Sequence, residues 1–198
     1  MARPSKFNRQ EAVEFVMNEF WRNGYEASSV KSLSEKLGIT RSSFYNAFGS
    51  REALFKEALE LYLNQSPDKV LALASPGEPI KELFVKTFRA ACKARASDTE
   101  GRGCMVINGV TELCNVHDEL GQVMENAVLG NLTRIEQLLE WGLAQGELGT
   151  GTDIHAKALA LQNLLMGLNV LCKVVTQEGE LWKAAETTLK GLDLFVEA

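Results

Sequence analysis

Apolar residues recur every three to four positions along most of the chain, which is the spacing of amphipathic α-helices. One such stripe covers residues 13–21 and stops before Gly24, and a shorter one covers residues 30–37 and stops before Gly38. No segment shows a convincing alternation at the period of two that a half-buried strand requires. The pattern therefore predicts an all-α fold.

Start and stop signals for three short helices are crowded together in the N-terminal part of the chain. Ser29, Thr40 and Ser50 each stand where an N-cap side chain can accept hydrogen bonds from the first backbone N–H groups of a helix. Gly38 can end the first of these helices, because glycine tolerates the left-handed backbone of a C-cap. Two helices joined by a short turn with glycine predict a helix-turn-helix, and an upstream helix capped by Asn8 can cover its back.

Downstream of this motif, the periodicity predicts helices over residues 51–64, 79–96, 104–114, 118–145, 153–176 and 181–196. The helix over 153–176, with Thr152 as its cap, carries leucine and valine on nearly every side, so it has to be buried on several sides. A membrane span is the competing interpretation of such a length, and Gln162, Asn163, Asn169 and the central Gly167 argue against it. We expect this helix to be buried partly in its own domain and partly against a second subunit.

Charge is divided unevenly along the chain. Of the formal net charge of −5, residues 1–57 contribute +2, from nine Lys or Arg against seven Asp or Glu, and the remainder contributes −7. Because non-specific DNA affinity depends on positive charge, we expect any binding to DNA to be selective and sensitive to salt.

The four cysteines and two histidines exclude several kinds of site. Nothing at the N-terminus resembles a signal peptide, so the cysteines are expected to be free thiols in a reducing cytoplasm. Their spacing with the histidines does not fit a zinc site, and no set of polar residues is spaced for catalysis. We therefore expect no metal, no cofactor and no enzymatic activity.

A set of short matches to a known family runs from Phe7 to Phe55. They are Gly24-Tyr25, Ser28-Ser29-Val30, Leu33, Gly38-Ile39-Thr40, Phe44-Tyr45, Phe48 and Arg51-Glu52-Ala53-Leu54. Together they resemble the DNA-binding domain of the TetR family of transcriptional repressors. The resemblance implies an all-α homodimer with a three-helix helix-turn-helix domain at residues 1–50 and a helical ligand-binding and dimerisation domain at residues 51–198. It also implies a dimer interface made by the two C-terminal helices and a near-palindromic double-stranded DNA operator as partner.

By position, the resemblance implies a set of DNA contacts. The residues placed against base edges are Thr40, Arg41, Ser42 and Ser43, with Arg41 as the candidate for bidentate recognition of a guanine. The residues placed against phosphates are Ser28 or Ser29, Tyr45, Asn46 and Arg51. A basic arm of Arg3, Lys6 and Arg9 is expected to reach the DNA backbone or minor groove. Ala47 departs from the family, which often has His at that position, so a usual phosphate contact is absent.

A second resemblance concerns the signal that the protein senses. The segment GRGCMVINGVTELC, residues 101–114, resembles a subgroup in which a Gly-Cys pair opens a helix and the Cys responds to electrophiles or oxidants in some members. Cys104 would lie near a helix N-terminus, where the helix dipole favours a thiolate, with Arg102 two residues away. Lys173 matches a Lys of those members and is expected to approach the same pocket. The competing interpretation is that Cys104 is a small buried hydrophobe.

The sequence thus predicts a TetR-type repressor that a small-molecule inducer, or modification of Cys104, releases from its operator. One alternative is a redox-insensitive regulator that binds a metabolite without forming a covalent bond. Another is a helical adaptor that kept the fold and lost DNA binding, and the intact segment from Thr40 to Arg51 argues against it.

Overall fold

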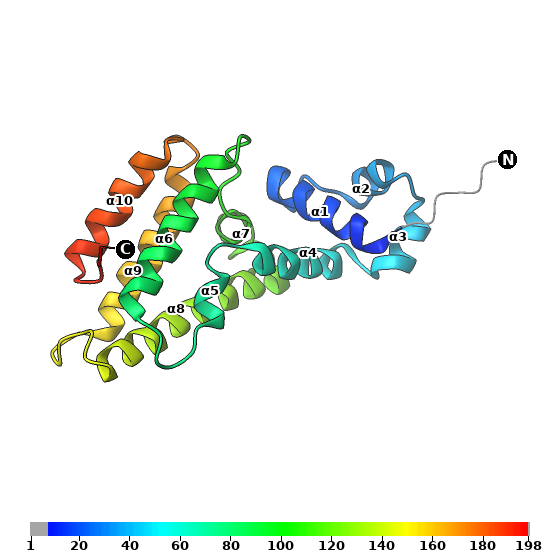
Figure 1. The fold of residues 1–198 in the computed structure, drawn as a ribbon. Helices are drawn as coiled ribbons and strands as arrows, with labels where there is room; N and C mark the ends of the chain where they lie inside the picture. Colours follow the sequence, from blue (N-terminus) through cyan, green and yellow to red (C-terminus); the bar gives the residue numbers. More distant parts are fainter. Residues whose placement is uncertain (1–7, 198) are drawn as a thin grey trace.

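The computed structural model describes residues 8–197, and in this part of the chain every regular element is an α-helix (Figure 1). The predicted fold class is therefore confirmed. Arg3, Lys6 and Phe7 lie outside the described residues.

Four helices form the end of the molecule on the right of Figure 1. They are α1 (Arg9–Asn23), α2 (Val30–Leu37), α3 (Arg41–Phe48) and α4 (Arg51–Gln65). The predicted caps are confirmed, because the hydroxyls of Ser29, Thr40 and Ser50 accept the backbone N–H of the third following residue at 3.0–3.1 Å. Gly38 ends α2 in the left-handed conformation, with φ of 68°.

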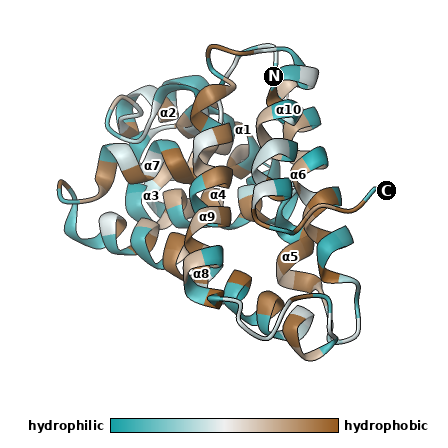
Figure 2. Cartoon of the chain, turned by 90° about the vertical axis from the view of Figure 1, so that its left-hand side faces the viewer, coloured by the Kyte–Doolittle hydropathy of each residue, from teal (hydrophilic) through white to brown (hydrophobic). Residues whose placement is uncertain are grey.

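The remaining six helices form the larger part of the molecule. They are α5 (Lys69–Leu73), α6 (Ile80–Ser97), α7 (Met105–Leu113), α8 (Asp118–Ala144), α9 (Ile154–Leu171) and α10 (Glu178–Gly191). Helix α6 packs against α10, and the long α8 packs against both α7 and α9 (Figure 1). Hydrophobic residues continue along most of α9 (Figure 2), as expected for a helix that packs on several sides.

Several predicted helix bounds are wrong. The cap of α9 is Asp153, whose carboxylate accepts the backbone N–H of Ala156 at 3.0 Å, and Thr152 precedes it. Helix α9 ends at Leu171, five residues before the predicted end, and α10 runs from Glu178 to Gly191. Over the described residues, no helix combines the length and the apolar character that a bilayer crossing needs.

Buried side chains form two clusters, and the first one crosses residue 50. It joins the apolar faces of α1–α4 to residues of α7 and of the start of α8, among them Met105, Leu113 and Leu120. The second cluster joins α5, α6, the rest of α8, α9 and α10. Helix α7 thus shares one continuous apolar core with the helix-turn-helix, and a movement of α7 bears directly on it.

Candidate functional site

Helix α3 separates an apolar face from a polar one. Phe44 and Phe48 are buried, with their ring centroids 5.2 Å apart. The side chains at the i, i+1, i+4 and i+5 positions of the opposite face are exposed, and they are Arg41, Ser42, Tyr45 and Asn46. Tyr45 is 51% exposed although it is aromatic, so its ring is available for a partner. The predicted contact face of α3 is therefore a real surface of the molecule.

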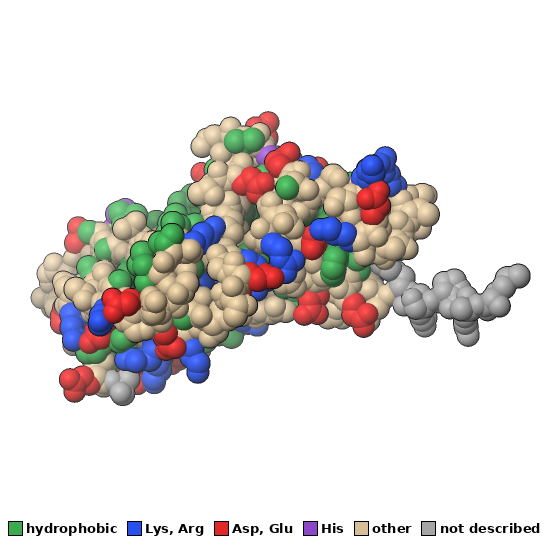
Figure 3. Space-filling model, turned by 90° about the horizontal axis from the view of Figure 1, so that it is seen from above, with side chains coloured by type: hydrophobic (Ala, Val, Ile, Leu, Met, Phe, Trp, Pro, Cys, Tyr) green, Lys and Arg blue, Asp and Glu red, His purple; other side chains and the backbone are tan. Residues whose placement is uncertain are grey.

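The cap of α3 uses two of the predicted base-reading residues. Thr40 Oγ1 accepts the backbone N–H of Ser43 at 3.1 Å and lies 2.9 Å from the Ser43 hydroxyl. Both side chains are exposed, and their mutual contact fixes the first turn of α3. At this end of the molecule, acidic and basic side chains are interspersed (Figure 3), which agrees with the small positive charge of residues 1–57.

Two neighbouring serines, both candidates for one phosphate contact, have different environments. Ser28 is buried, and its hydroxyl donates to the carbonyl oxygen of Gly24 at 2.7 Å. Of the two alternatives, Ser28 is the less suited to a phosphate contact, because its hydroxyl is enclosed and already bonded inside the turn between α1 and α2. Ser29 is exposed while it caps α2, which leaves it as the candidate.

Arg51 has partners inside the protein. Its guanidinium lies 3.8 Å from the centroid of the Tyr25 ring and donates to the Tyr25 carbonyl oxygen at 3.3 Å. Burial and the hydrogen bond to Glu52 raise the pKa of Tyr25 to about 12. Arg51 thus holds the start of α4 against the turn between α1 and α2, and any phosphate contact has to share its donors.

Arg9, the described residue of the predicted basic arm, is folded back onto the protein. Its guanidinium donates to Glu57 of α4 at 2.7 Å and to the Ala47 carbonyl oxygen at 3.2 Å. Its predicted reach toward DNA therefore stays a prediction, and a contact with DNA would have to compete with these partners within the N-terminal helices.

A cavity of about 400 Å³ lies between α4, α5, α7, α8 and α9, and we call it the sensing cavity. Its apolar lining is typical of a small-molecule site, and it includes Leu73, Val106, Ile107, Val128, Leu165 and Met166. Cys104, the N-cap residue of α7, also lines it and is 7% exposed. All four cysteines are free.

The cation beside Cys104 is Arg95 of α6. Arg95 is 6% exposed, donates to Tyr62 Oη at 3.1 Å and to Asn169 Oδ1, and interacts electrostatically with the Cys104 thiol. Burial raises the pKa of the Tyr62 hydroxyl, and the neighbouring thiol raises it further. Arg102, two residues before Cys104 in the sequence, instead stacks 3.8 Å from the centroid of the Trp21 ring and pairs with Asp98.

Lys173 lies beside the Gly-Cys pair without lining the sensing cavity. Its Nζ donates to Asn108 Oδ1 at 2.7 Å, and its Cε comes within 2.9 Å of the position that a Cβ on Gly103 would occupy. The Asn169 carbonyl oxygen lies 2.5 Å from the same position, and Gly103 has φ of 71°. The close packing of α9 on this turn therefore requires glycine before Cys104.

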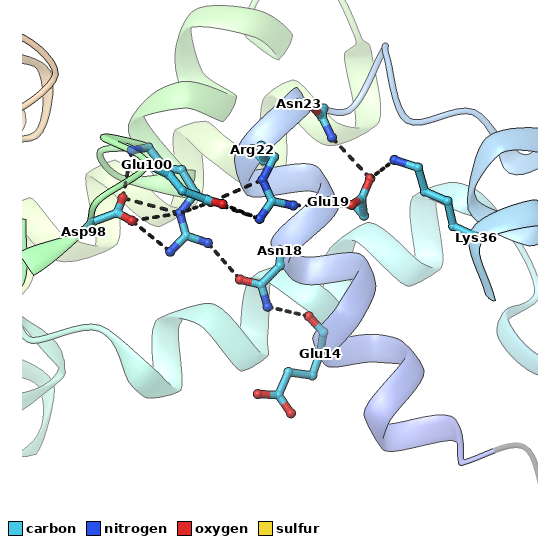
Figure 4. Close-up of polar contacts among 9 residues, drawn as sticks. Glu14, Asn18, Glu19, Arg22, Asn23, Lys36, Asp98 and Glu100 are labelled. Carbon is cyan, nitrogen blue, oxygen red and sulfur yellow. Dashed lines mark hydrogen bonds and ion pairs between the residues drawn. The ribbon is translucent and has the colours of Figure 1, made fainter.

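Two sets of contacts tie α7 and the loop before it to α1, and Figure 4 shows the pair between Arg22 and Glu100 that belongs to the first set. At the loop, Trp21 Nε1 donates to the Gly103 carbonyl oxygen at 3.2 Å, and Arg22 pairs with Glu100 at 2.7 Å. At the far end of α7, the Glu112 carboxylate accepts the backbone N–H groups of Tyr25 and Glu26 at 3.0 and 2.9 Å. Both ends of α7 are thus attached to the end of α1.

Comparison with known proteins decides the family. Residues 17–58 match the family described as bacterial regulatory proteins, tetR family, and residues 84–188, more than half of the chain, match the tetracyclin repressor-like C-terminal domain. The chain belongs to the TetR family. It is therefore a TetR-type DNA-binding transcriptional regulator, a class distinct from enzymes.

Individual TetR-family relatives extend the comparison. The transcriptional repressor ComR of Escherichia coli K12 is 26% identical over 95% of this chain and 90% of its own length. The regulator CifR, solved as a cysteine mutant with a 26-bp operator DNA, is 29% identical, covers 96% of this chain and 98% of its own, and has a TM-score of 0.82. Reduced E. coli NemR, at 18% identity over 93% of this chain and 94% of its own, with a TM-score of 0.73, shows the same fold.

Sequence reasoning missed four residues of this TetR-family site, although the chain held a signal for two of them. Arg95 continues the buried stripe of α6 after Phe88 and Ala91, an unusual place for a charge. Glu112 is the one charged residue in the apolar run 104–114. Asn169 stands out in the sequence only as a polar residue in the apolar run 153–176, without any indication of its partner, and nothing in the local sequence singles out Tyr62. Among residues 8–197, no cluster of three or more His, Cys, Asp or Glu side chains is placed to hold a metal ion.

Proposed function

We propose that this TetR-family protein is a homodimeric repressor that binds a near-palindromic operator and leaves it when the sensing cavity receives its signal. The observation that carries the proposal is the exposed polar face of α3, presented on a buried pair of aromatic rings. Arg41 is the residue we assign to base recognition, and Ser29, Tyr45 and Asn46 are assigned to phosphates. ComR, described as a repressor, and CifR, solved on operator DNA, support the proposal of a DNA-binding repressor. Because the proposed function requires access to DNA, we expect the protein to be located in the cytoplasm.

The dimer interface that we propose lies on α9 and α10. Helix α9 has an exposed stripe at helical spacing, which comprises Leu159, Asn163, Gly167 and Val170 and continues to Val174. Val170 is 54% exposed and Val174 is 80% exposed, an unfavourable state for such side chains unless a second copy covers them. In this arrangement residues 1–50 read DNA and residues 51–198 sense and dimerise. Two reading helices related by a two-fold axis fit half-sites about 34 Å apart, or a multiple of that spacing.

Two kinds of signal fit the sensing cavity. In the first, an electrophile such as an α,β-unsaturated carbonyl compound adds to Cys104, so that one S–C bond forms and the thiol proton ends on the α-carbon. The position of Cys104 at the cavity wall, in electrostatic interaction with the Arg95 guanidinium, supports this version. In the second, an apolar or amphipathic ligand binds without a covalent bond, and the largely apolar lining supports it.

The signal reaches the DNA through α7. A group added at Cys104 displaces the start of α7, and the attachments at Trp21 and Glu112 pass that displacement to α1. A switch of the operator-bound population from 99:1 to 1:99 requires roughly 5.5 kcal/mol of differential affinity, so a complete response needs more than one contact to change.

Selection of operators from random duplex DNA tests the proposal. We expect a near-palindrome to be enriched, and N-ethylmaleimide to weaken its binding by the wild type. The Cys104→Ser variant should bind the operator with an affinity that N-ethylmaleimide does not change. Cys114→Ser, at the other end of α7, is the matched control and should respond as the wild type does. Failure to enrich a palindrome contradicts the repressor, whereas unchanged affinity after confirmed alkylation of Cys104 contradicts the thiol version and leaves the reversible ligand.

A further inference from the structure

A second hollow, of about 600 Å³, lies between the N-terminal helices and α6, and we call it the α1–α6 hollow. Its lining comes from α1, the end of α4, α6 and the loop before α7. The residues that bear on its chemistry are Trp21, Arg22, Gln65, Arg95, Thr99 and Arg102. It is distinct from the sensing cavity, although Tyr62 and Ser66 contribute to the walls of both.

Arg95 is a buried cation without an acidic partner. Among the described residues no carboxylate is in ion-pair distance of its guanidinium, and its two hydrogen bonds go to neutral oxygens of Asn169 and Tyr62. Its Nη1 makes no hydrogen bond within the same part of the chain and is not one of the fully enclosed atoms that lack a partner, so it keeps some access to solvent. A guanidinium has five donors and stays charged, and a buried charge that lacks a counter-charge is costly. An anion that enters the α1–α6 hollow would supply the counter-charge that the described part of the protein does not provide.

The other charges around the hollow are already compensated. Arg22 pairs with Glu100 at 2.7 Å, and Arg102 pairs with Asp98 at 3.0 Å, so the lining keeps one net positive charge, that of Arg95. Figure 4 shows Arg22, Asp98 and Glu100 held together across the junction between α1 and the loop before α7. The hollow is therefore matched to a monoanion.

We propose that the α1–α6 hollow binds a small monocarboxylic acid whose carboxylate pairs with Arg95. The planar guanidinium matches a carboxylate in a two-point contact, and a volume near 600 Å³ lies within the range of small-molecule sites. The Trp21 and Pro67 side chains offer apolar contact for the body of the acid, and Gln65 and Thr99 offer polar contact.

A bound acid would also alter Cys104. The positive charge that interacts with the Cys104 thiol is the same one that the acid neutralises. Alkylation proceeds through a thiolate, so a carboxylate bound beside Arg95 is expected to slow the reaction of Cys104 with an electrophile.

The test uses the full-length protein without DNA, so its outcome does not depend on the proposed repressor function. Propionate, benzoate and phenylacetate are compared with their amides at constant ionic strength, by thermal shift and titration calorimetry. We expect the acids, and not the amides, to raise the melting temperature. Arg95→Met should abolish the effect, and Lys93→Met, which removes an exposed charge from the same helix, should retain it. Equal shifts with acids and amides, or an effect that survives in Arg95→Met, would overturn the proposal.

Two further measurements keep the test decisive if Arg95→Met does not fold. Ala94→Trp fills the α1–α6 hollow, and Leu73→Trp places the same side chain at the sensing cavity. Binding lost in Ala94→Trp and kept in Leu73→Trp supports the proposal, and the reverse result overturns it. In the wild type, the acids should slow the reaction of Cys104 with N-ethylmaleimide and the amides should not. Equal rates with acid and amide contradict the inference.

Discussion

The bond between Glu112 and the turn after α1 gives the most direct test of how α7 is attached to the helix-turn-helix. The carboxylate accepts two backbone N–H groups, at 3.0 Å from Tyr25 and 2.9 Å from Glu26, and fits against Gly24, where a Cβ would come within 2.8 Å of its oxygens. Glu112→Gln keeps the shape of the side chain but leaves one acceptor oxygen. The amide nitrogen then faces a backbone N–H, so at least one charge-assisted hydrogen bond is lost.

The magnitude follows from that loss. A hydrogen bond to a charged group contributes about 1.5–3 kcal/mol to the free energy of unfolding. For a chain of this size, the melting temperature of Glu112→Gln should therefore fall by roughly 3–12 °C. Glu119→Gln is the matched control, because Glu119 joins α8 to α4 through an exposed ion pair with Lys56 at 2.5 Å. An exposed pair contributes about 0–1 kcal/mol, so this control should stay close to the wild type.

The functional measurement is the ratio of operator affinities before and after alkylation of Cys104. We expect Glu112→Gln to bind the operator in the absence of the reagent and to show a smaller ratio than the wild type, because one of the two attachments of α7 is weakened. Glu119→Gln should keep the wild-type ratio. If Glu112→Gln matches Glu119→Gln in both melting temperature and ratio, the attachment does not transmit the signal and the reasoning is refuted.

Three other predictions concern the reading helix, the Gly-Cys turn and the dimer. Arg41→Ala should weaken operator binding by about 1–3 kcal/mol and relax the preference at one base pair, as measured by binding to single-base operator variants. Gly103→Ala should lower the urea midpoint far more than Gly101→Ala, because both glycines have positive φ but only at Gly103 does a Cβ meet a backbone oxygen, 2.5 Å away. Val170→Glu should sediment as a monomer, whereas Val70→Glu, a comparably exposed position on α5, should remain a dimer, and a dimeric Val170→Glu would contradict the proposed interface.

The parts of the fold that the sequence predicts well depend on short-range contacts. The caps at Ser29, Thr40 and Ser50 bond to residues only three positions away, so the residue types and their spacing are sufficient. The predicted end of α9 is wrong because an apolar pattern does not show which side chains are buried. The pattern continues through Val174 and Val175, whereas the helix ends at Leu171 and Val174 lies on the surface.

The candidate site depends on contacts between distant parts of the chain, which local patterns do not contain. Arg95 meets Tyr62 across 33 residues and Asn169 across 74, and Glu112 meets Tyr25 across 87. A motif match also does not show which of two adjacent serines faces the solvent. Ser28 and Ser29 differ because the turn directs the hydroxyl of Ser28 to the Gly24 carbonyl oxygen. The resemblance therefore located the reading surface and the Gly-Cys pair, and the tertiary structure was needed to find the charges around them.

Helix α7 connects Cys104, the residue of the proposed thiol response, directly to the helix-turn-helix. Cys104 caps its first turn at the sensing cavity, and Glu112 lies about 12 Å further along the same helix. Because the loop is bonded to Trp21 at one end and Glu112 to Tyr25 at the other, we expect a displacement that starts at Cys104 to pass through α7 to α1. The apolar core that α7 shares with α1 and α4 is close-packed, so it resists compression. A change at one thiol is therefore expected to move the reading helices as a unit, and not to loosen a single contact.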